Sequence, residues 1–156
     1  MLNGIWQIFL TAMIPLTELR LAIPFGYAQF DLNIWLIVLA GILGNIFVVA
    51  LVLLLLPLIV NFFWQIAVFR EILEIIFKHT RHKYSGKISR WGEIALILFV
   101  AIPLPGSGGW TGALIAYLFG LSYWKSMKFI SIGLTIAGVL VGLLTIGIDK
   151  FVNLFI

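Results

Sequence analysis

Long runs without a charged residue alternate along the chain with shorter apolar stretches that proline interrupts. Residues 32–56 contain neither a charged side chain nor a proline, and residues 129–148 form a second such run. Each run reaches the roughly 20 apolar residues that a helix needs to cross the hydrocarbon core of a bilayer. The pattern therefore predicts two transmembrane helices, one within residues 31–57 and one within residues 122–156.

The other two apolar stretches, residues 1–30 and 93–121, are broken in the middle. Pro15 and Pro24 interrupt the first, and a run of proline and glycine after Ile102 interrupts the second. The flanking pieces 3–14, 93–102 and 110–121 hold only ten to twelve residues. At about 1.5 Å per residue, a helix of that length crosses about half a bilayer. We therefore expect each broken stretch to form a re-entrant helical hairpin that enters the membrane and returns.

The basic residues indicate how these segments are threaded. Six of the ten Lys and Arg residues lie between Arg70 and Arg90. Cytoplasmic loops carry such an excess, so we expect the connector 58–92, and residues 78–90 above all, to be cytoplasmic. Lys125 and Lys128 fall on the same side only if residues 93–121 return to the side from which they entered. Charge bias thus favours the hairpin over a single crossing.

Short sequence matches suggest that the two halves are repeats. Leu32-x-x-Trp35 recurs as Leu121-x-x-Trp124, 89 residues later, and an Ile-Pro-Leu triplet precedes both spans. The fold class predicted is an all-α integral membrane protein with two inverted repeats. Each repeat is a re-entrant hairpin followed by a transmembrane helix, and a basic amphipathic connector joins them. Inverted repeats with broken helices that meet near the midplane are typical of transporters.

Composition narrows the class of protein. Of the 156 residues, 63% are hydrophobic and only 10% are charged. A soluble domain carries about 25% charged residues, so this composition excludes a soluble enzyme, a disordered chain and a nucleic-acid-binding domain. The chain has no cysteine and hence neither a disulfide nor a thiolate metal site. We expect a single membrane domain, residues 1–156, that crosses the inner membrane more than once.

The connector has a helical pattern of its own. Polar positions from Asn61 to Arg81 recur at helical spacing, and apolar positions occupy the other side. Such a helix lies either on the inner membrane surface or against its own protein. His79 and His82 share a helix face in this pattern, but their basic surroundings oppose a metal ion, so we expect no metal site.

Glu18 and Arg20 are the one ionisable pair within an otherwise apolar segment. A charge inside a membrane is expensive, by at least about 2.5 kcal/mol on insertion scales, and is usually retained for function. Burial raises the pKa of a carboxyl group, so Glu18 is a candidate for proton coupling. Arg20 offers a planar fork for a phosphate or carboxylate. The alternative is an ion pair at the mouth of the hairpin.

The second candidate site is the broken middle of the second stretch, where closely spaced glycines expose backbone N–H groups. With the prolines of the first hairpin, the candidate turn and anion-binding positions are Pro15, Pro24, Pro103, Pro105, Gly106, Ser107, Gly108, Gly109, Trp110, Thr111 and Gly112. A half-helix that starts near Trp110 would point its positive end at an anion, which could be the Glu18 carboxylate itself. A tight turn that needs glycine only for close packing fits the same composition.

The sequence contains no Ser/His/Asp constellation, no paired catalytic carboxylates and no metal-ligand cluster. We therefore expect neither an enzyme nor a cofactor.

The motifs around Glu18-Leu19-Arg20 and from Pro103 to Leu114 resemble those of the putative small multidrug export family, over most of the chain. That family looks like a distant relative of the DedA membrane proteins, and this relationship implies paired re-entrant hairpins. They are linked to the movement of lipid carriers such as undecaprenyl phosphate. The resemblance implies a transporter, with Glu18, Arg20 and the turn from Pro103 to Thr111 as its characteristic positions.

These observations lead to three hypotheses for the function. The first is a proton-coupled transporter of a small amphipathic solute. The second is a flippase or scramblase of an anionic lipid, and the third is a scaffold or assembly subunit that transports nothing. Membrane lipid is an expected partner in each. Two spans make a thin wall for a pore, so we also expect a homo-oligomer, most simply a dimer.

Overall fold

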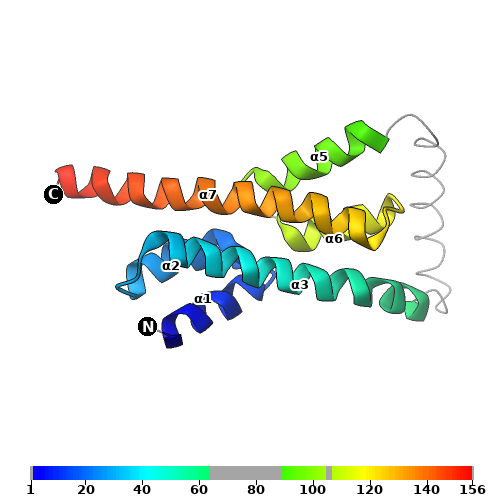
Figure 1. Cartoon of the computed structure of the whole chain (residues 1–156), viewed down its shortest axis with the longest axis horizontal. Coiled ribbons are helices and arrows are strands. Elements are labelled where there is room, and N and C mark those ends of the chain that lie inside the picture. The colour runs from blue at the N-terminus through cyan, green and yellow to red at the C-terminus, as the bar shows by residue number, and fades with distance from the viewer. Residues whose placement is uncertain (1, 64–88, 105–106, 156) are drawn as a thin grey trace.

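The computed structural model describes residues 2–63, 89–104 and 107–155, which form six helices and no strand. Four helices are short and two are long (Figure 1). They are α1 (Leu2–Met13), α2 (Glu18–Gln29), α3 (Ile34–Phe63), α5 (Ser89–Ala101), α6 (Gly109–Leu118) and α7 (Tyr123–Phe155). The all-helical prediction is confirmed for the described residues. The basic connector, with its proposed amphipathic face and the pair His79 and His82, lies largely outside them.

The long helices α3 and α7 are long and apolar enough to cross a membrane, as the sequence predicts. They pack against each other and carry the short helices on their sides (Figure 1). Gly138 and Gly142 of α7 bring the two helices together. A Cβ atom on Gly138 would lie 2.6 Å from Ile42, and one on Gly142 would lie 2.6 Å from Val38. The absence of a side chain at these two positions therefore allows the backbones of α3 and α7 to approach closely.

The helices α1 and α2 form a first helical hairpin. The helix α1 ends at Met13 because Pro15 disfavours helical backbone in the residue before it. The pair packs mainly against α3, and α2 also contacts α7. The helix α1 crosses α3 at Gly44, where a Cβ atom would collide with the backbone carbonyl of Phe9.

The helices α5 and α6 form a second hairpin with the reciprocal contacts: α5 packs on α7, and α6 packs on both α7 and α3. The helix α5 crosses α7 at Gly133, where a Cβ atom would lie 2.8 Å from Val100 and 2.9 Å from the Ile97 carbonyl. Gly44 and Gly133 are 89 residues apart, the same offset that relates Trp35 to Trp124. Each long helix thus packs closely against the first helix of the hairpin before it, with a glycine at the contact.

The two hairpins come from opposite ends of the molecule. Both ends of the α1–α2 hairpin lie near the chain termini, and both ends of the α5–α6 hairpin lie at the opposite end of the bundle (Figure 1). An ion pair of 3.7 Å between Lys125 and Glu93 joins the start of α7 to the start of α5. At the opposite end, the Tyr27 hydroxyl donates a hydrogen bond of 3.0 Å to Asp149. The tips of both hairpins therefore meet near the middle of the long axis.

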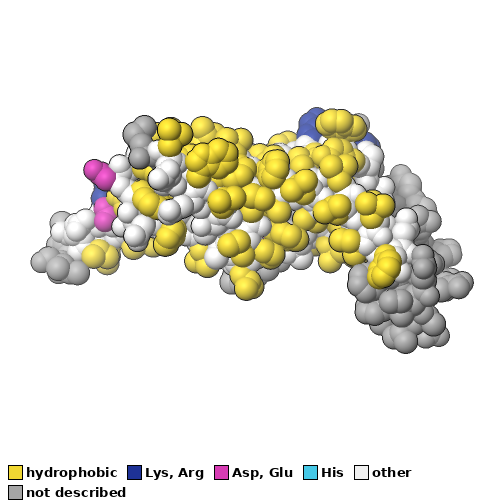
Figure 2. Space-filling model, turned by 90° about the horizontal axis from the view of Figure 1, so that it is seen from below, with side chains coloured by type: hydrophobic (Ala, Val, Ile, Leu, Met, Phe, Trp, Pro, Cys, Tyr) yellow, Lys and Arg dark blue, Asp and Glu magenta, His cyan; other side chains and the backbone are white. Residues whose placement is uncertain are grey.

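The surface between these two ends is apolar. Figure 2 shows hydrophobic side chains over the middle of one face and charged side chains at its two ends. Most residues in the apolar windows of α3 and α7 are not buried within the protein, and Leu54, Leu58 and Leu144 are more than half exposed. A soluble protein rarely exposes so large an apolar surface. The arrangement is that of a membrane protein.

Two prolines, Pro24 and Pro57, lie inside helices. The sequence predicts that Pro24 interrupts the first hairpin, but Pro24 lies inside α2, and Pro57, at the expected limit of the first span, lies inside α3. Each proline removes one backbone hydrogen bond from its helix, and packing against neighbouring helices compensates for this loss. The span expected within residues 31–57 therefore continues to Phe63. Likewise, the expected connector 58–92 overlaps the ends of α3 and α5, and α7 continues through the expected C-terminal tail to Phe155.

Candidate functional site

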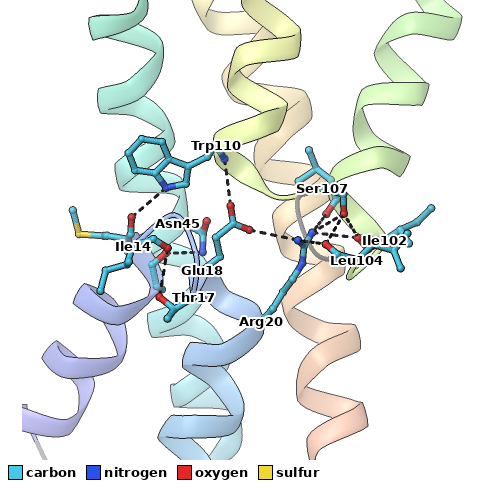
Figure 3. A network of polar contacts seen from close by, with 12 residues as sticks. Ile14, Thr17, Glu18, Arg20, Asn45, Ile102, Leu104, Ser107 and Trp110 are labelled. Atoms are coloured by element: carbon cyan, nitrogen blue, oxygen red, sulfur yellow. Dashed lines mark hydrogen bonds and ion pairs between the residues drawn. The ribbon is translucent and has the colours of Figure 1, made fainter.

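Glu18 lies at the tip of the first hairpin and begins α2. It is the one residue other than glycine with a positive φ among those described, with φ of 42°. Left-handed backbone at a residue with a side chain costs about 1 kcal/mol and has to be held by its surroundings. Only 6% of Glu18 is exposed. The strained backbone turns the carboxylate inward, toward the second hairpin (Figure 3).

The Glu18 carboxylate caps the N-terminus of α6. Its Oε1 atom accepts a long hydrogen bond of 3.5 Å from the backbone N–H of Trp110. Gly108 occupies the N-cap position and provides no side-chain cap. A Cβ atom on Gly108 would overlap the Glu18 carboxylate. Glycine at 108 is therefore required for the close approach, and a negative charge at this helix end is favourable because the helix dipole is positive there.

Arg20 binds the other end of the broken segment, at the C-terminus of α5. Its guanidinium group donates hydrogen bonds to the carbonyl oxygens of Leu104 and Ile102, the latter at 3.2 Å. It also donates to the Ser107 hydroxyl at 3.1 Å and to the Val100 carbonyl at 3.5 Å. The last carbonyls of a helix lack partners within the helix and carry its negative end. Arg20 therefore supplies the positive charge and the donors that this helix end needs.

These contacts explain why two opposite charges stand two residues apart. The C-terminus of α5 and the N-terminus of α6 face the same tip, one electronegative and the other electropositive. Arg20 lies at the former and Glu18 at the latter, and their side chains form an ion pair of 3.6 Å between Nη1 and Oε2. On a regular helix residues two apart do not face each other. Here the backbone of Glu18 is left-handed rather than helical, and the side chains of Glu18 and Arg20 point toward each other.

The C-terminus of α1 is capped by residues from three different elements. The Thr17 hydroxyl donates to the Thr11 carbonyl, and the indole Nε1 of Trp110 donates to the Met13 carbonyl at 3.2 Å. The side-chain amide of Asn45, in the middle of α3, donates to the Ala12 carbonyl at 3.0 Å. In a membrane each unsatisfied backbone group is costly. The tips of the two hairpins therefore satisfy one another's free helix ends.

Among the described residues there is no group of three or more His, Cys, Asp or Glu side chains that could hold a metal ion. The chemistry available at the hairpin tips is that of one buried carboxylate and one guanidinium group. The carboxylate can take up or release a proton, and the guanidinium group can bind an anion.

A model of the family described as "Putative small multi-drug export protein" matches residues 18–140. This match covers more than half of the chain. The chain belongs to that family. No curated protein and no solved structure matches it. The relationship to the DedA membrane proteins stays a prediction.

The family match begins at Glu18 and covers α2, α3, the tip of the second hairpin with α5 and α6, and most of α7. The helix α1 and the turn that follows it precede the match. The residues whose charges cap the broken segment are therefore inside the region that defines the family.

The turn and anion-binding positions proposed from the sequence fall into four groups. Pro15, Pro103, Ser107 and Gly108 lie in the two turns. Gly109, Trp110, Thr111 and Gly112 belong to the first turn of α6 instead, and Gly112 faces Val100 and Ile130 rather than the polar tip. Pro24 lies within α2, away from the turn. Pro105 and Gly106 are outside the described residues.

Asn45 and Thr17 are parts of the site that sequence reasoning missed. Asn45 is fully buried and is the one residue with a polar side chain between Trp35 and Val60. A lone polar side chain within a transmembrane span usually has a specific partner. That signal was present in the sequence, whereas nothing there indicated that the partner would be the end of α1.

Proposed function

We propose that this protein is a proton-coupled membrane transporter that exports a small amphipathic solute. The observation that carries the proposal is the Glu18 carboxylate, buried where the tips of the two hairpins meet and shared between Arg20 and the N-terminus of α6. An isolated ionisable pair at such a depth points to an ion or substrate pathway. The family description points to a small protein that exports several drugs.

In this proposal the two hairpins are re-entrant and the two halves are inverted repeats. The equivalent glycines Gly44 and Gly133 support the repeats. The ion pair between Glu93 and Lys125 supports the threading, because it joins the start of α5 to the start of α7, so the second hairpin begins and ends at the same end of the bundle. We infer an inner-membrane protein with residues 78–90 in the cytoplasm and both termini outside.

Protonation of Glu18 is the proposed coupling step. The ionised carboxylate attracts Arg20 and the positive end of α6, so it holds the two tips together. A proton removes the charge and with it most of this attraction, and the tips then separate. Since a proton binds better to the separated form, a pH gradient shifts the equilibrium between the two forms. Alternating access in transporters of this architecture rests on such movements of one repeat against the other.

A transport assay tests the proposal. The purified protein is reconstituted into proteoliposomes, a pH gradient is imposed, and the movement of the cationic dye ethidium and of protons is followed. We expect wild-type protein to move dye in proportion to the gradient, and Glu18→Gln to reduce this movement to the level of empty vesicles. The matched control is Glu93→Gln, which removes a charge from a paired carboxylate at the end of the bundle. Gradient-driven dye movement by Glu18→Gln would overturn the proposal.

A second candidate is a flippase or scramblase of an anionic lipid carrier such as undecaprenyl phosphate. The observation that favours it is the Nε atom of Arg20, which is buried and has no hydrogen-bond partner among the described residues. A phosphate group could accept from it. In vesicles with fluorescent phosphatidylglycerol or phosphatidylcholine, this candidate requires faster movement of the anionic lipid, lost in Arg20→Gln. Folded protein that moves neither dye nor lipid would instead favour a scaffold.

We also propose a homodimer, because two spanning helices and two half-length hairpins enclose little space for a solute. The mass of the detergent-solubilised protein, measured by light scattering with correction for detergent, tests this. A dimer mass is expected, and a monomer mass at the concentrations used for transport would contradict it.

A further inference from the structure

One buried acceptor in the site has no donor. Asn45 is fully buried in the middle of α3, and its Oδ1 atom has no hydrogen-bond partner among the described residues. The orientation of this amide is fixed by its other contact. The Ala12 carbonyl can only accept a hydrogen bond, so the amide has to present Nδ2 to it, at 3.0 Å. Rotating the amide would place two acceptors against each other, and Oδ1 therefore points away from α1.

The free oxygen of Asn45 and the carboxylate of Glu18 lie at the same turn of α6. A Cβ atom on Gly109 would lie 3.2 Å from Oδ1 of Asn45, and one on the preceding residue, Gly108, would overlap the Glu18 carboxylate. Figure 3 shows the two side chains beside each other, between the end of α1 and the start of α6. An ionised carboxylate has no proton to donate, so the two groups offer only acceptors to each other.

We propose that Asn45 is a positioning residue for proton coupling, and that its Oδ1 atom accepts a hydrogen bond from Glu18 when Glu18 is protonated. This inference rests on the proposed function and names the partner of the protonated carboxyl group. A protonated carboxyl has one O–H donor, which is what the buried Oδ1 atom lacks. The neutral Glu18 side chain then bonds to α3 instead of to Arg20 and α6. Asn45 thereby stabilises the form in which the hairpin tips are released.

Few other groups near Glu18 could affect its protonation. Arg20 on α2 is the charged side chain that faces it. The helices α1 and α3 have no ionisable side chain, and α6 has only Tyr117, near its C-terminal end. The described ionisable residues of α5 and α7 lie toward the ends of the bundle, as the pairs Glu93–Lys125 and Tyr27–Asp149 show. The protonation equilibrium of Glu18 thus depends on Arg20, on the end of α6 and on Asn45.

The test follows the protonation of Glu18 directly, without transport. Infrared difference spectra of the reconstituted protein are recorded during a pH titration, and the protonated carboxyl band of Glu18 is identified by its absence in Glu18→Gln. We expect Asn45→Leu to weaken proton binding about tenfold, which lowers the midpoint by about one pH unit, because the neutral carboxyl loses its acceptor. More apolar surroundings alone would move the midpoint in the opposite direction. An unchanged or higher midpoint in Asn45→Leu would overturn the inference.

A second variant covers the possibility that Asn45→Leu does not fold. Asn45→Asp keeps the shape of the side chain and places two carboxyl groups side by side, so we expect a higher midpoint for the Glu18 band. No rise would overturn the proximity on which the inference rests. The control is Ser126→Ala, which alters another fully buried polar side chain, whose hydroxyl donates to the Ser122 carbonyl just before α7, and which should leave the midpoint unchanged.

The two proposals fail in different ways. A Glu18 band that titrates with the expected shifts, in a protein that moves no solute, would contradict the transport function alone. A midpoint that Asn45 does not affect, in a protein with proton-coupled transport, would contradict this inference alone. The absence of any Glu18 titration between about pH 4 and pH 10 would overturn both.

Discussion

The Oε1 atom of Glu18 lies 3.5 Å from the backbone nitrogen of Trp110, so a carboxylate from one hairpin caps a helix of the other. Two residues later, Arg20 binds the carbonyl oxygens that end α5. A helix that stops inside a membrane leaves N–H and C=O groups without partners, and water is not available to bind them. The two charges of the first hairpin therefore stabilise both ends of the break in the second.

Replacing Gly108 tests how close this contact is. Its φ of −87° and ψ of −163° are allowed for any residue, so alanine introduces no backbone strain. Its Cβ atom would nevertheless overlap the Glu18 carboxylate. We expect Gly108→Ala to destabilise the folded protein by about 2 kcal/mol, as overpacking does. Chemical denaturation in detergent measures the change.

The same experiment has an internal control. In the double variant Glu18→Ala/Gly108→Ala the overlap is gone, so the second substitution should cost at least about 1 kcal/mol less than it does alone. Gly147→Ala is the matched control, because a Cβ atom there would meet nothing within 4 Å. Additive effects of the two changes would show that residues 18 and 108 are not in contact.

The variant Arg20→Lys separates the contribution of the positive charge to stability from that of the shape of the guanidinium group. Lysine keeps the positive charge beside Glu18 but lacks the planar fork that reaches the Leu104 and Ile102 carbonyls and Ser107. We expect a loss of about 2 kcal/mol of stability for Arg20→Lys. Arg20→Gln should lose about 3 kcal/mol, because it also leaves the Glu18 charge unpaired. Equal stability of Arg20→Lys and wild type would mean that the charge alone matters.

Part of this arrangement could be predicted from the sequence. The long runs without charge predicted α3 and α7, and the proline-glycine break predicted two short helices in place of one span. Glu18 and Arg20 stood out because charges are rare in apolar segments. Their partners could not be predicted, since Val100 to Trp110 lie about 80 or more residues away and chain spacing does not indicate which helix ends meet.

The prolines show a second limit of prediction from sequence, which concerns where helices end. Pro15 and Pro103 lie in turns, but Pro24 and Pro57 lie inside helices. Locally all four have the same effect, which is the loss of one N–H donor. Packing decides the outcome: Leu19, Ile23 and Gly26 of α2 are buried around Pro24 and hold that helix together. Such contacts depend on the tertiary structure, which a local sequence pattern does not contain.

Two glycines test the equivalence of the halves. Gly44→Ala and Gly133→Ala each place a Cβ atom against the backbone of the crossing helix, at Phe9 and at Ile97. Because backbone atoms cannot rotate away, we expect each substitution to destabilise the protein by about 2 kcal/mol or more. Thermal unfolding in detergent measures both, beside Gly147→Ala. A large effect at one site and none at the other would contradict equivalent crossings.

Single cysteines test the threading, since the chain has no cysteine of its own. We expect Ser85→Cys in the connector and Ser122→Cys before α7 to react with an impermeant maleimide from the cytoplasmic side. Asn33→Cys before α3 should react from the opposite side. Labelling is compared in intact and inverted membrane vesicles. Reaction of positions 85 and 122 from opposite sides would exclude a re-entrant second hairpin.

The most direct test of the account is the distance between the two hairpin tips as a function of pH. Spin labels at Ile14 and Leu104, which are 50% and 58% exposed, report this distance by double electron–electron resonance in lipid nanodiscs. We predict a single short distance at high pH and a longer, broader distribution on acidification. In Glu18→Gln the distribution should be broad at every pH. Distances that stay short at all pH values in both proteins would contradict the claim that a proton on Glu18 releases the tips.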